Sequence, residues 1–264
     1  MKKTTLTLLI ILGTFLLPAM ASAQAELITL ASFETKYGDY GLYQGRAHNI
    51  RQAASIVGEV TLQPSERFSF NERVGERTSA NGFRRAPVII SGRLTRGLGG
   101  GVCQLASTIY AAALYSGLEI VEQHPHSRIS IYTRPGLDAT VDWGTKDLVI
   151  VNPYPFPVTM QVTIREGDRV AREVVSVVFT ARQSIYDVVV RFHEQQIAEF
   201  DTRLEFSIRL PPGEQRVDEP GTPAIQVVVR RTLYPKVWLL SPIHERIVVR
   251  YPASIRIVSI GLPL

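Results

Sequence analysis

Apolar side chains recur at helical spacing in the segment Arg46–Val60, at positions 50, 53, 54 and 57. Residues three and four apart share one face of an α-helix, so this spacing predicts an amphipathic helix. Leu62-Gln63-Pro64 ends it, because proline lacks a backbone donor and disfavours helix in the residue before it. The alternating segment Glu66–Asn71 and the apolar segment Ala86–Ser91 then predict two short strands.

A second helix is predicted from Cys103 to Leu118. The segment is rich in alanine and leucine, contains no proline, and reaches Gly117, a residue type common at helix C-termini. Its apolar side chains occur all round the helix rather than along one stripe. Because a helix that is apolar on every face is a buried one, we expect this helix to lie inside the protein.

Segments typical of β-strands follow, at residues 119–122, 148–151, 158–164, 174–180, 225–230 and 246–251. Glu166-Gly167-Asp168 predicts a hairpin turn, and the proline- and glycine-rich stretch 211–223 predicts a turn-rich interruption. The whole pattern predicts an α+β fold. In it, a buried helix starting at Cys103 packs on a mainly antiparallel sheet, and a small β-rich C-terminal module follows.

The N-terminus has the features of a secretory signal peptide. Lys2 and Lys3 precede an apolar run from Leu6 to Leu17, and Ala21-Ser22-Ala23 fits a cleavage site. We expect residues 1–23 to be removed and the chain to be exported to the periplasm or cell envelope. An uncleaved N-terminal anchor is the alternative. No later segment is long and apolar enough to cross a bilayer, so no transmembrane span is expected after cleavage.

The rest of the chain is predicted to divide into three parts. These are a lead segment at 24–45, a main domain at 46–182 and the β-rich C-terminal module at 183–264. The change of composition near residue 181, after which glycines become few, marks the last boundary. His193 and His244 lie in the C-terminal part, and both are interpreted as structural or surface residues.

The charge balance favours an anionic partner that is not a nucleic acid. The formal net charge is +5, and loss of Lys2 and Lys3 with the signal peptide leaves +3. Arginine, which outnumbers lysine, suits bidentate contact with carboxylates. The arginines are spread along the chain rather than clustered, and the protein is predicted to be exported, so nucleic acid is a poor fit. An anionic cell-wall polymer or an acidic peptide stem fits better.

The candidate chemistry centres on Cys103, the only cysteine, which excludes an internal disulfide. Gly97-Leu98-Gly99-Gly100-Gly101 precedes it, and a glycine-rich backbone can take positive φ and let another group approach closely. A helix N-terminus favours an anion and lowers a thiol pKa, so the thiolate nucleophile becomes available at neutral pH. The alternative is a small buried hydrophobic residue.

Two histidines follow in Gln123-His124-Pro125-His126-Ser127, and the extended backbone expected beside Pro125 places them on the same side. Either could act as general base for the thiol. Asp138 or Asp142 could then orient the imidazole, which completes a Cys-His-acid arrangement. Cys103, His124 and His126 could instead bind zinc, although no fourth ligand is evident.

Several motifs, in this order, resemble the VanW family of bacterial envelope proteins. They are Phe68-Ser69-Phe70-Asn71, Arg77-Thr78, Gly82-Phe83, Ala86-Pro87-Val88-Ile89, Gly99-Gly100-Gly101-Val102-Cys103-Gln104, Gly117-Leu118-Glu119-Ile120, His124-Pro125-His126-Ser127 and Asp138-Ala139-Thr140. The resemblance covers roughly residues 46–180. It implies an exported protein that acts on the stem peptides of peptidoglycan, since some members are understood to be L,D-transpeptidases with a cysteine nucleophile.

Carried over to this chain, the resemblance implies that Cys103 is the nucleophile, His126 the first choice of general base and His124 the second. Asp138 would orient the base. Gln104 and the backbone N–H groups of Gly100 and Gly101 would form an oxyanion hole.

Asn71, Ser127 and Arg128 are candidate substrate-binding residues on the same basis. Two positions depart from the family pattern: Leu105-Ala106-Ser107-Thr108 replaces a Ser-Thr-Thr run, and Leu137 replaces an arginine. Neither a cofactor nor a metal is implied. The alternative function is a non-catalytic envelope-binding accessory protein linked to glycopeptide resistance, and the oligomeric state is left open.

Overall fold

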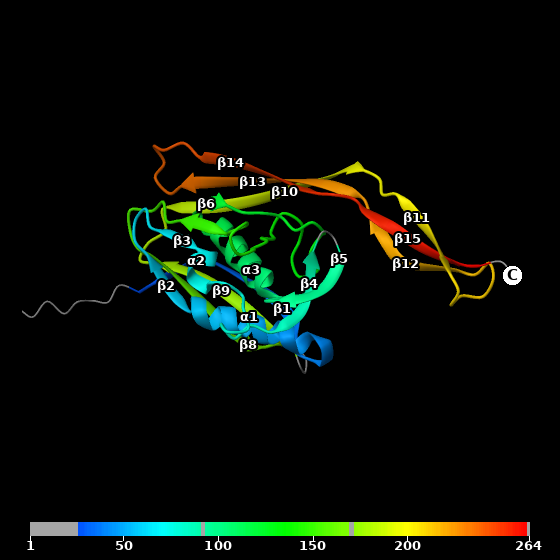
Figure 1. The fold of residues 1–264 in the computed structure, drawn as a ribbon. Coiled ribbons are helices and arrows are strands. Elements are labelled where there is room, and N and C mark those ends of the chain that lie inside the picture. The colour runs from blue at the N-terminus through cyan, green and yellow to red at the C-terminus, as the bar shows by residue number, and fades with distance from the viewer. Residues whose placement is uncertain (1–25, 91–92, 169–171, 263–264) are drawn as a thin grey trace, which may run out of the picture.

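The computed structural model describes residues 26–90, 93–168 and 172–262 (Figure 1). The predicted signal peptide lies outside these residues. Within them the α+β prediction is confirmed, because most of the structure is antiparallel sheet and a few helices complete it. No helix among the described residues is both long enough and apolar enough to cross a membrane.

A four-stranded antiparallel sheet forms one wall of the core. Its strands are β1 (Ile28–Gly38), β9 (Arg172–Ala181), β8 (Val158–Glu166) and β2 (Glu59–Leu62), in that order. Neighbours pair antiparallel throughout. The strands β8 and β9 remain paired as far as Glu166, which lies opposite Glu173 at the predicted hairpin.

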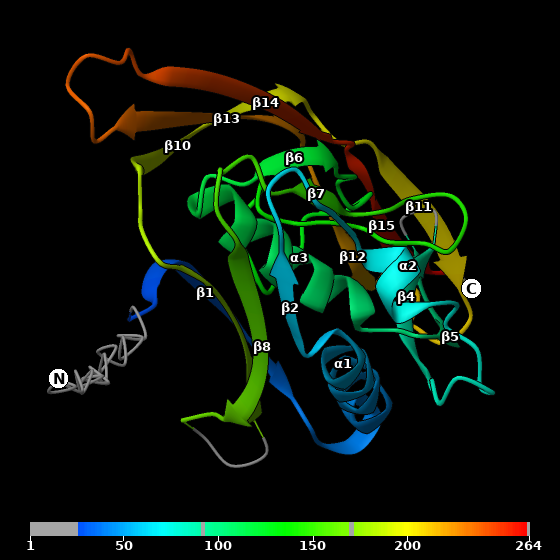
Figure 2. The same ribbon diagram turned by 90° about the vertical axis from the view of Figure 1, so that its left-hand side faces the viewer.

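The helix α3 (Val102–Tyr115) packs on this sheet, with α1 (Gln44–Val57) beside it (Figure 2). The prediction that the cysteine-bearing helix is buried is confirmed, since nearly all its side chains after Cys103 lie in the core. The Thr108 and Thr35 hydroxyls join α3 to β1 by a hydrogen bond of 2.8 Å. α1 ends before Gly58, whose φ of 56° turns the chain into β2.

Three predicted segments differ in the structure. The helix expected over Arg46–Val60 ends at Val57, because Gly58 takes positive φ there, and the strand β2 begins at Glu59, before the proline that was expected to end the helix. The strand expected at Glu66–Asn71 is shorter, β3 (Arg67–Ser69), and the helix α2 (Phe70–Val74) follows at once. Its start is fixed by Ser69, whose Oγ accepts a hydrogen bond from the Glu72 N–H at 3.1 Å. The stretch expected to be turn-rich contains the strand β12 (Gln215–Thr222), because pairing with β15 (Ser254–Gly261) overrides its proline and glycine content.

Smaller elements surround the start of α3. The strands β3, β7 (Val149–Val151) and β6 (Glu119–Glu122) form one antiparallel sheet. The strands β4 (Arg85–Ile90) and β5 (Arg93–Leu98) form a hairpin that leads directly into the glycine-rich turn. A short 3-10 helix, η1 (Gly41–Tyr43), precedes α1.

The C-terminal region contains two three-stranded sheets. The first consists of β10 (Tyr186–Ala198), β13 (Ala224–Pro235) and β14 (Ile243–Tyr251), and it covers α3 on the side opposite the four-stranded sheet (Figure 1). The second consists of β11 (Thr202–Ser207), β15 and β12, extends away from the body, and includes the parallel pair β11–β15.

The first of these sheets shares its core with α3. Buried side chains on its inner face, Ile225, Val227, Val229, Val249 and Tyr251, belong to the same hydrophobic cluster as the helix. The buried Arg231 guanidinium donates hydrogen bonds to the carbonyls of Leu114 at 3.2 Å and Leu118 at 2.7 Å, at the C-terminal end of α3. A cation there also interacts favourably with the helix dipole.

Candidate functional site

Cys103 is the second residue of α3 and follows a turn that only glycine can form. Gly101 is the N-cap residue of the helix, with φ of 106°, and a Cβ there would lie 2.6 Å from Arg46 Cγ. A Cβ on Gly100 would lie 2.5 Å from the Pro87 carbonyl oxygen. The glycines therefore let the helix start directly against α1 and β4, which fixes the position of the thiol.

The thiol of Cys103 lies close to the imidazole of His126. Cys103 is partly buried, its Sγ lies 3.5 Å from the Val141 carbonyl oxygen, and His126 is near enough to act on the pKa of the thiol through hydrogen bonding and charge. His126 lies in the loop after β6 and presents a second ring nitrogen, Nδ1, to Asp138 at 2.7 Å. The other ring nitrogen, Nε2, lies 3.3 Å from the Tyr132 hydroxyl and is the one that can also interact with the thiol. His126 is therefore positioned between Cys103 and Asp138.

Asp138 is fully buried and both of its carboxylate oxygens are occupied. Oδ2 also accepts a hydrogen bond from the backbone N–H of His126 at 2.8 Å. Oδ1 accepts one from the hydroxyl of Tyr251, which comes from β14, and that hydroxyl in turn accepts the Gly136 N–H at 2.7 Å. The carboxylate is thus held in place from two sides, and it fixes the ring of His126.

The surroundings favour a thiolate paired with an imidazolium. Burial alone raises the pKa of Cys103, but the hydrogen bond and positive charge of His126, with the charge of Arg77, lower that pKa below its ordinary value. Burial alone lowers the pKa of His126, whereas Asp138 and Cys103 raise it to about 9. Each partner therefore stabilises the charged form of the other.

The structure does not bring His124 to the thiol. Its Nε2 lies 2.9 Å from Glu122 Oε1, and the ring is about one-third exposed. The two histidines therefore have different partners, contrary to the expectation that they project together. Within the described residues, no group of three His, Cys, Asp or Glu side chains is arranged to hold a metal ion.

Gln104 is oriented away from the thiol, and its side-chain amide is fully used inside the protein. Nε2 donates to Thr35 Oγ1 at 2.9 Å and to the Lys36 carbonyl at 3.0 Å, and Oε1 accepts from the Arg46 guanidinium. This side chain is therefore not a free oxyanion donor. Its role is to join α3 to β1 and α1.

A backbone donor is available instead. In the first turn of α3, the N–H of Val102 is bound to the Gly99 carbonyl at 3.1 Å and that of Gln104 to the Gly101 carbonyl at 2.9 Å. The N–H of Cys103 has no partner among the described residues. A free N–H at a helix start, next to the thiol, is suited to bind an oxyanion.

The three candidate substrate-binding residues have separate environments. Asn71 is buried; its side chain donates a hydrogen bond to the Lys146 carbonyl at 2.9 Å and accepts one from Arg77 Nη2 at 2.6 Å. It therefore holds the loop that contains Lys146 in place. Ser127 is exposed beside His126. Arg128 reaches Glu219 of β12 at 3.5 Å.

The structure adds polar residues that the sequence analysis missed. The hydroxyl of Tyr132 lies 3.3 Å from His126 Nε2 and 3.3 Å from Ser107 Oγ. The Arg46 guanidinium lies over the Tyr132 ring, 5.8 Å from its centroid. No sequence motif marks either Tyr132 or Tyr251. For Tyr251 the reason is its distance along the chain, since it lies 113 residues from Asp138.

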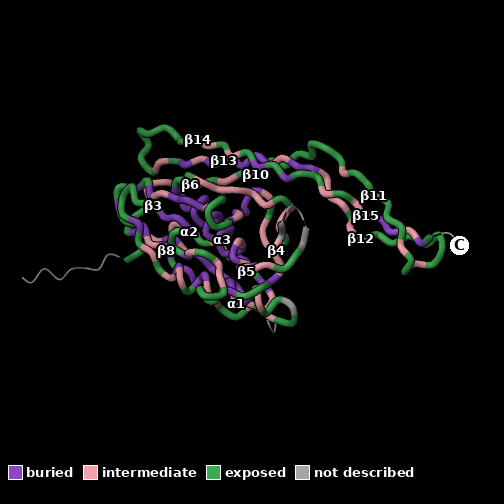
Figure 3. The backbone as a smooth tube through the Cα atoms, in the orientation of Figure 1, coloured by how far each residue is buried: buried purple, intermediate pink, exposed green. Residues whose placement is uncertain are grey.

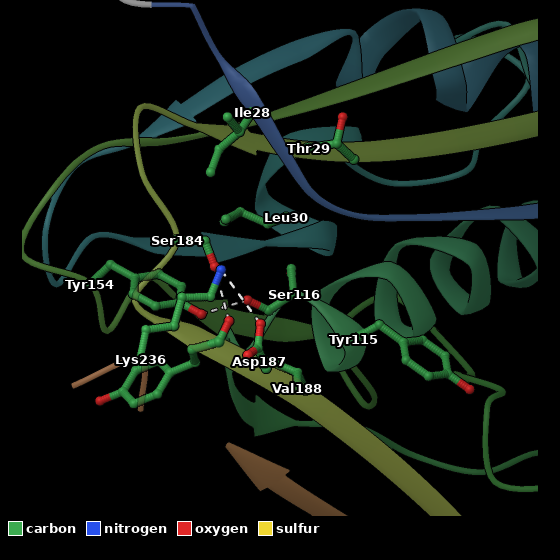
Figure 4. A pocket seen from close by; sticks show the side chains of 11 residues that line it. Ile28, Thr29, Leu30, Tyr115, Ser116, Tyr154, Ser184, Asp187, Val188 and Lys236 are labelled. Atoms are coloured by element: carbon green, nitrogen blue, oxygen red, sulfur yellow. Dashed lines mark hydrogen bonds and ion pairs between the residues drawn. The ribbon is translucent and has the colours of Figure 1, made fainter. Parts of the chain in front are cut away.

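Two hollows lie at different distances from the thiol. One, of about 430 Å³, follows the segment Trp143–Asp147, just after Val141, and is also lined by Ser69, Asn71, Glu72 and Glu122. The other, of about 320 Å³, lies at Tyr115 and Ser116, the opposite end of α3 from Cys103 (Figure 4). A helix of this length spans about 20 Å, so the second hollow is remote from the thiol. The first is lined by the segment that follows Val141, and neither Cys103 nor His126 lines it.

Comparison with known proteins identifies relatives for about half of the chain. Residues 45–174 match the family model described as VanW like protein. The chain is 42% identical over 118 residues to the uncharacterized protein YoaR of Bacillus subtilis, covering 45% of this chain and 39% of that one. It is 26% identical over 130 residues to the Vancomycin B-type resistance protein VanW of Enterococcus faecalis, covering 47% of each.

The chain thus spans less than half the length of these two relatives. Among solved structures, HP0197-G5 aligns with 28% of this chain and 97% of its own at 13% identity, with a TM-score of 0.16. The family match contains Cys103, His126 and Asp138, and ends before Tyr251. Through residues 45–174, the chain belongs to the VanW family.

Proposed function

We propose that this protein is an exported L,D-transpeptidase that acts on peptidoglycan stem peptides through a Cys103 thioester. The observation that carries the proposal is the position of His126 between Cys103 and Asp138, with the thiol at the start of a buried helix. A nucleophile, a base close to it and a group that orients the base are the parts that acyl transfer requires.

In the first half-reaction, the Cys103 thiolate attacks the carbonyl carbon of the third stem residue. The carbonyl oxygen becomes negatively charged, and the N–H of Cys103 donates a hydrogen bond to it. The bond from that carbon to the nitrogen of the terminal D-amino acid then breaks. His126 gives its Nε2 proton to the leaving amine, which departs, and a thioester remains on Cys103.

In the second half-reaction, a side-chain amine of another stem peptide attacks the thioester carbonyl. Neutral His126 accepts a proton from the attacking nitrogen through Nε2. The carbon–sulfur bond breaks, so the thiolate is regenerated, and an amide bond now joins the two stems. Asp138 holds Nδ1 throughout, which keeps Nε2 directed at the reacting atoms.

The hollow along Trp143–Asp147 is the proposed binding site for the stem peptide. It lies beside the loop that carries Val141, whose carbonyl contacts the thiol. Its lining includes the ammonium of Lys146 and the carboxylates of Glu72, Glu122 and Asp147, so it offers charges of both signs to a substrate that carries both. The VanW name of the Enterococcus relative links the family to vancomycin resistance, and a reaction on wall peptides agrees with that link.

The test is mass spectrometry of the protein incubated with a tetrapeptide-stem muropeptide. We expect loss of the terminal D-alanine, with a cross-linked or hydrolysed product, in the wild type and none with Cys103→Ala. His126→Gln should lower turnover by two orders of magnitude or more, the range for loss of a general base.

His124→Gln is the matched control, since it removes an imidazole two residues away that does not contact the thiol. Its turnover should stay within about twofold of wild type. The proposal fails if no stem composition is turned over while Cys103 is also inert to a small alkylating reagent in the folded protein. In that case, a non-catalytic envelope-binding role explains the fold better.

A further inference from the structure

Three arginines lie side by side across the sheet formed by β10, β13 and β14. In the strand register, Arg191 is opposite Arg230, and Arg230 is opposite Arg246. All three are exposed, whereas Val229 and Arg231, the neighbours of Arg230 along β13, are buried toward α3. The three arginines, which we call the arginine row, therefore lie on the outer face of the sheet, with side chains on adjacent strands about 5 Å apart.

The arginine row has no compensating charge in the described parts of the chain. None of its guanidinium groups has an ion-pair or hydrogen-bond partner there. Of the described residues that alternate onto this outer face, only Asp187 is acidic, and it pairs with Lys236 at 3.4 Å. Like charges placed opposite one another destabilise a sheet, so an anion bound across the row would relieve that repulsion.

The same sheet ends in an exposed apolar turn. Between β13 and β14, the side chains of Val237, Trp238, Leu239 and Leu240 are 52%, 89%, 71% and 60% exposed. Figure 3 shows this turn, at the edge of the molecule, in the colour of exposed residues. Single exposed apolar residues are ordinary on a protein surface, but four in succession at a tip indicate contact with an apolar phase.

The described chain begins at this same end of the molecule. Ile28 and Leu30, near the start of β1, line one hollow together with Lys236 at the base of the turn (Figure 4). In sequence, the apolar run of residues 6–17 lies shortly before this point. An N-terminal segment of that kind engages a bilayer, either transiently as a signal peptide or as an anchor.

We infer that the outer face of the β10–β13–β14 sheet and the 237–240 turn dock on an anionic lipid bilayer. Tryptophan and leucine at the turn enter the interfacial region, which tryptophan favours, and the arginine row meets anionic headgroups. A soluble anionic polymer would satisfy the arginines and leave the four apolar side chains in water. An uncharged apolar protein surface would cover the turn and leave the arginines unpaired.

The experiment measures co-sedimentation of the full chain with vesicles of 30% phosphatidylglycerol in phosphatidylcholine, and with phosphatidylcholine alone. We expect binding to the anionic vesicles, weakened by salt, and little binding to the zwitterionic ones. The triple variant R191Q/R230Q/R246Q should lose about 100-fold in affinity, from about fivefold for each basic residue near an anionic surface. Trp238→Ser with Leu239→Ser should also weaken binding, without unfolding the protein, because both side chains are exposed.

A matched control separates the position of the charges from their number. Arg182, Arg203 and Arg209 are exposed elsewhere on the chain, and changing all three to Gln removes the same net charge. This control variant should bind anionic vesicles nearly as well as wild type. The inference is overturned if the control variant and the row variant lose affinity equally, or if wild type binds a soluble poly(glycerol phosphate) and not the vesicles.

Trp238 also reports insertion directly. The chain contains two tryptophans, so Trp143→Phe leaves Trp238 as the only one. Its fluorescence emission should shift to shorter wavelength with anionic vesicles. An unchanged emission spectrum at saturating lipid would refute insertion of the turn. None of these measurements uses turnover, so they stand or fall separately from the transpeptidase proposal.

Discussion

Replacing Asp138 by asparagine should make the Cys103 thiol less reactive without moving it. The change keeps the size of a fully buried side chain and removes the negative charge that lies 2.7 Å from His126 Nδ1. A neutral amide holds an imidazolium less strongly than a carboxylate does. The pKa of His126 then falls from about 9, and the thiolate loses part of the positive charge that stabilises it.

The magnitude follows from the type of hydrogen bond that is weakened. A hydrogen bond to a charged group contributes about 1.5–3 kcal/mol, and a neutral one about 1 kcal/mol. The difference, about 1.4 kcal/mol, is a factor of about ten in an equilibrium constant. A factor of ten in this equilibrium lowers the pKa of His126 by about one unit, so in Asp138→Asn the imidazolium should be lost, and the alkylation profile should change, about one pH unit lower than in wild type.

The assay is the rate of iodoacetamide alkylation from pH 5 to 10, followed by intact mass. Because the chain has one cysteine, every alkylated molecule reports Cys103. Asp142→Asn is the control, since the Asp142 carboxylate accepts from the Thr145 hydroxyl and does not contact His126. The reasoning is refuted if the two variants have the same pH profile, or if Asp138→Asn keeps the wild-type profile while folded.

Three further predictions concern the same site. Tyr251→Phe leaves the buried Gly136 N–H and Asp138 Oδ1 without their partner, so it should lower the free energy of unfolding by about 2 kcal/mol in urea denaturation, whereas the exposed Tyr234→Phe should not. Gly101→Ala should cost about 1–2 kcal/mol by the same measurement, because φ of 106° is strained for alanine and its Cβ would press on Arg46. The pKa of His126 is raised in the folded state, so its protonated form contributes fully to the free energy of unfolding below about pH 6.5, and this contribution is lost as the pH rises through about 9. A curve of unfolding free energy against pH that lacks this loss would contradict the ion pair.

The position of Cys103 at the start of a buried helix could be predicted because its determinants are local in sequence. Glycines before Cys103 and alanines after it specify a tight turn and a buried helix, whatever the rest of the chain does. Short strands with apolar runs were also predictable. The strand β12 was not, since its pairing with β15 depends on residues about forty positions away.

The partners of the site could not be read in the same way. Gln104 is next to Cys103 in sequence, but successive helical residues point about 100° apart, so its side chain faces β1 and α1 instead. The separation of His124 from His126 depends on Glu122 and Asp138, which the loop conformation brings to different rings. Tyr251 enters the site through the packing of β14, which no local pattern specifies.

The buried Arg231 has a practical consequence for work on related chains. A chain shortened to the family match, or to residue 182, would lose the guanidinium that closes the end of α3 and the hydroxyl that holds Asp138. It would also leave the apolar surface of α3 open to water. An assay on such a fragment would report an unstable or unreactive thiol and give a false negative, so the unit to express and test is the whole chain through β14.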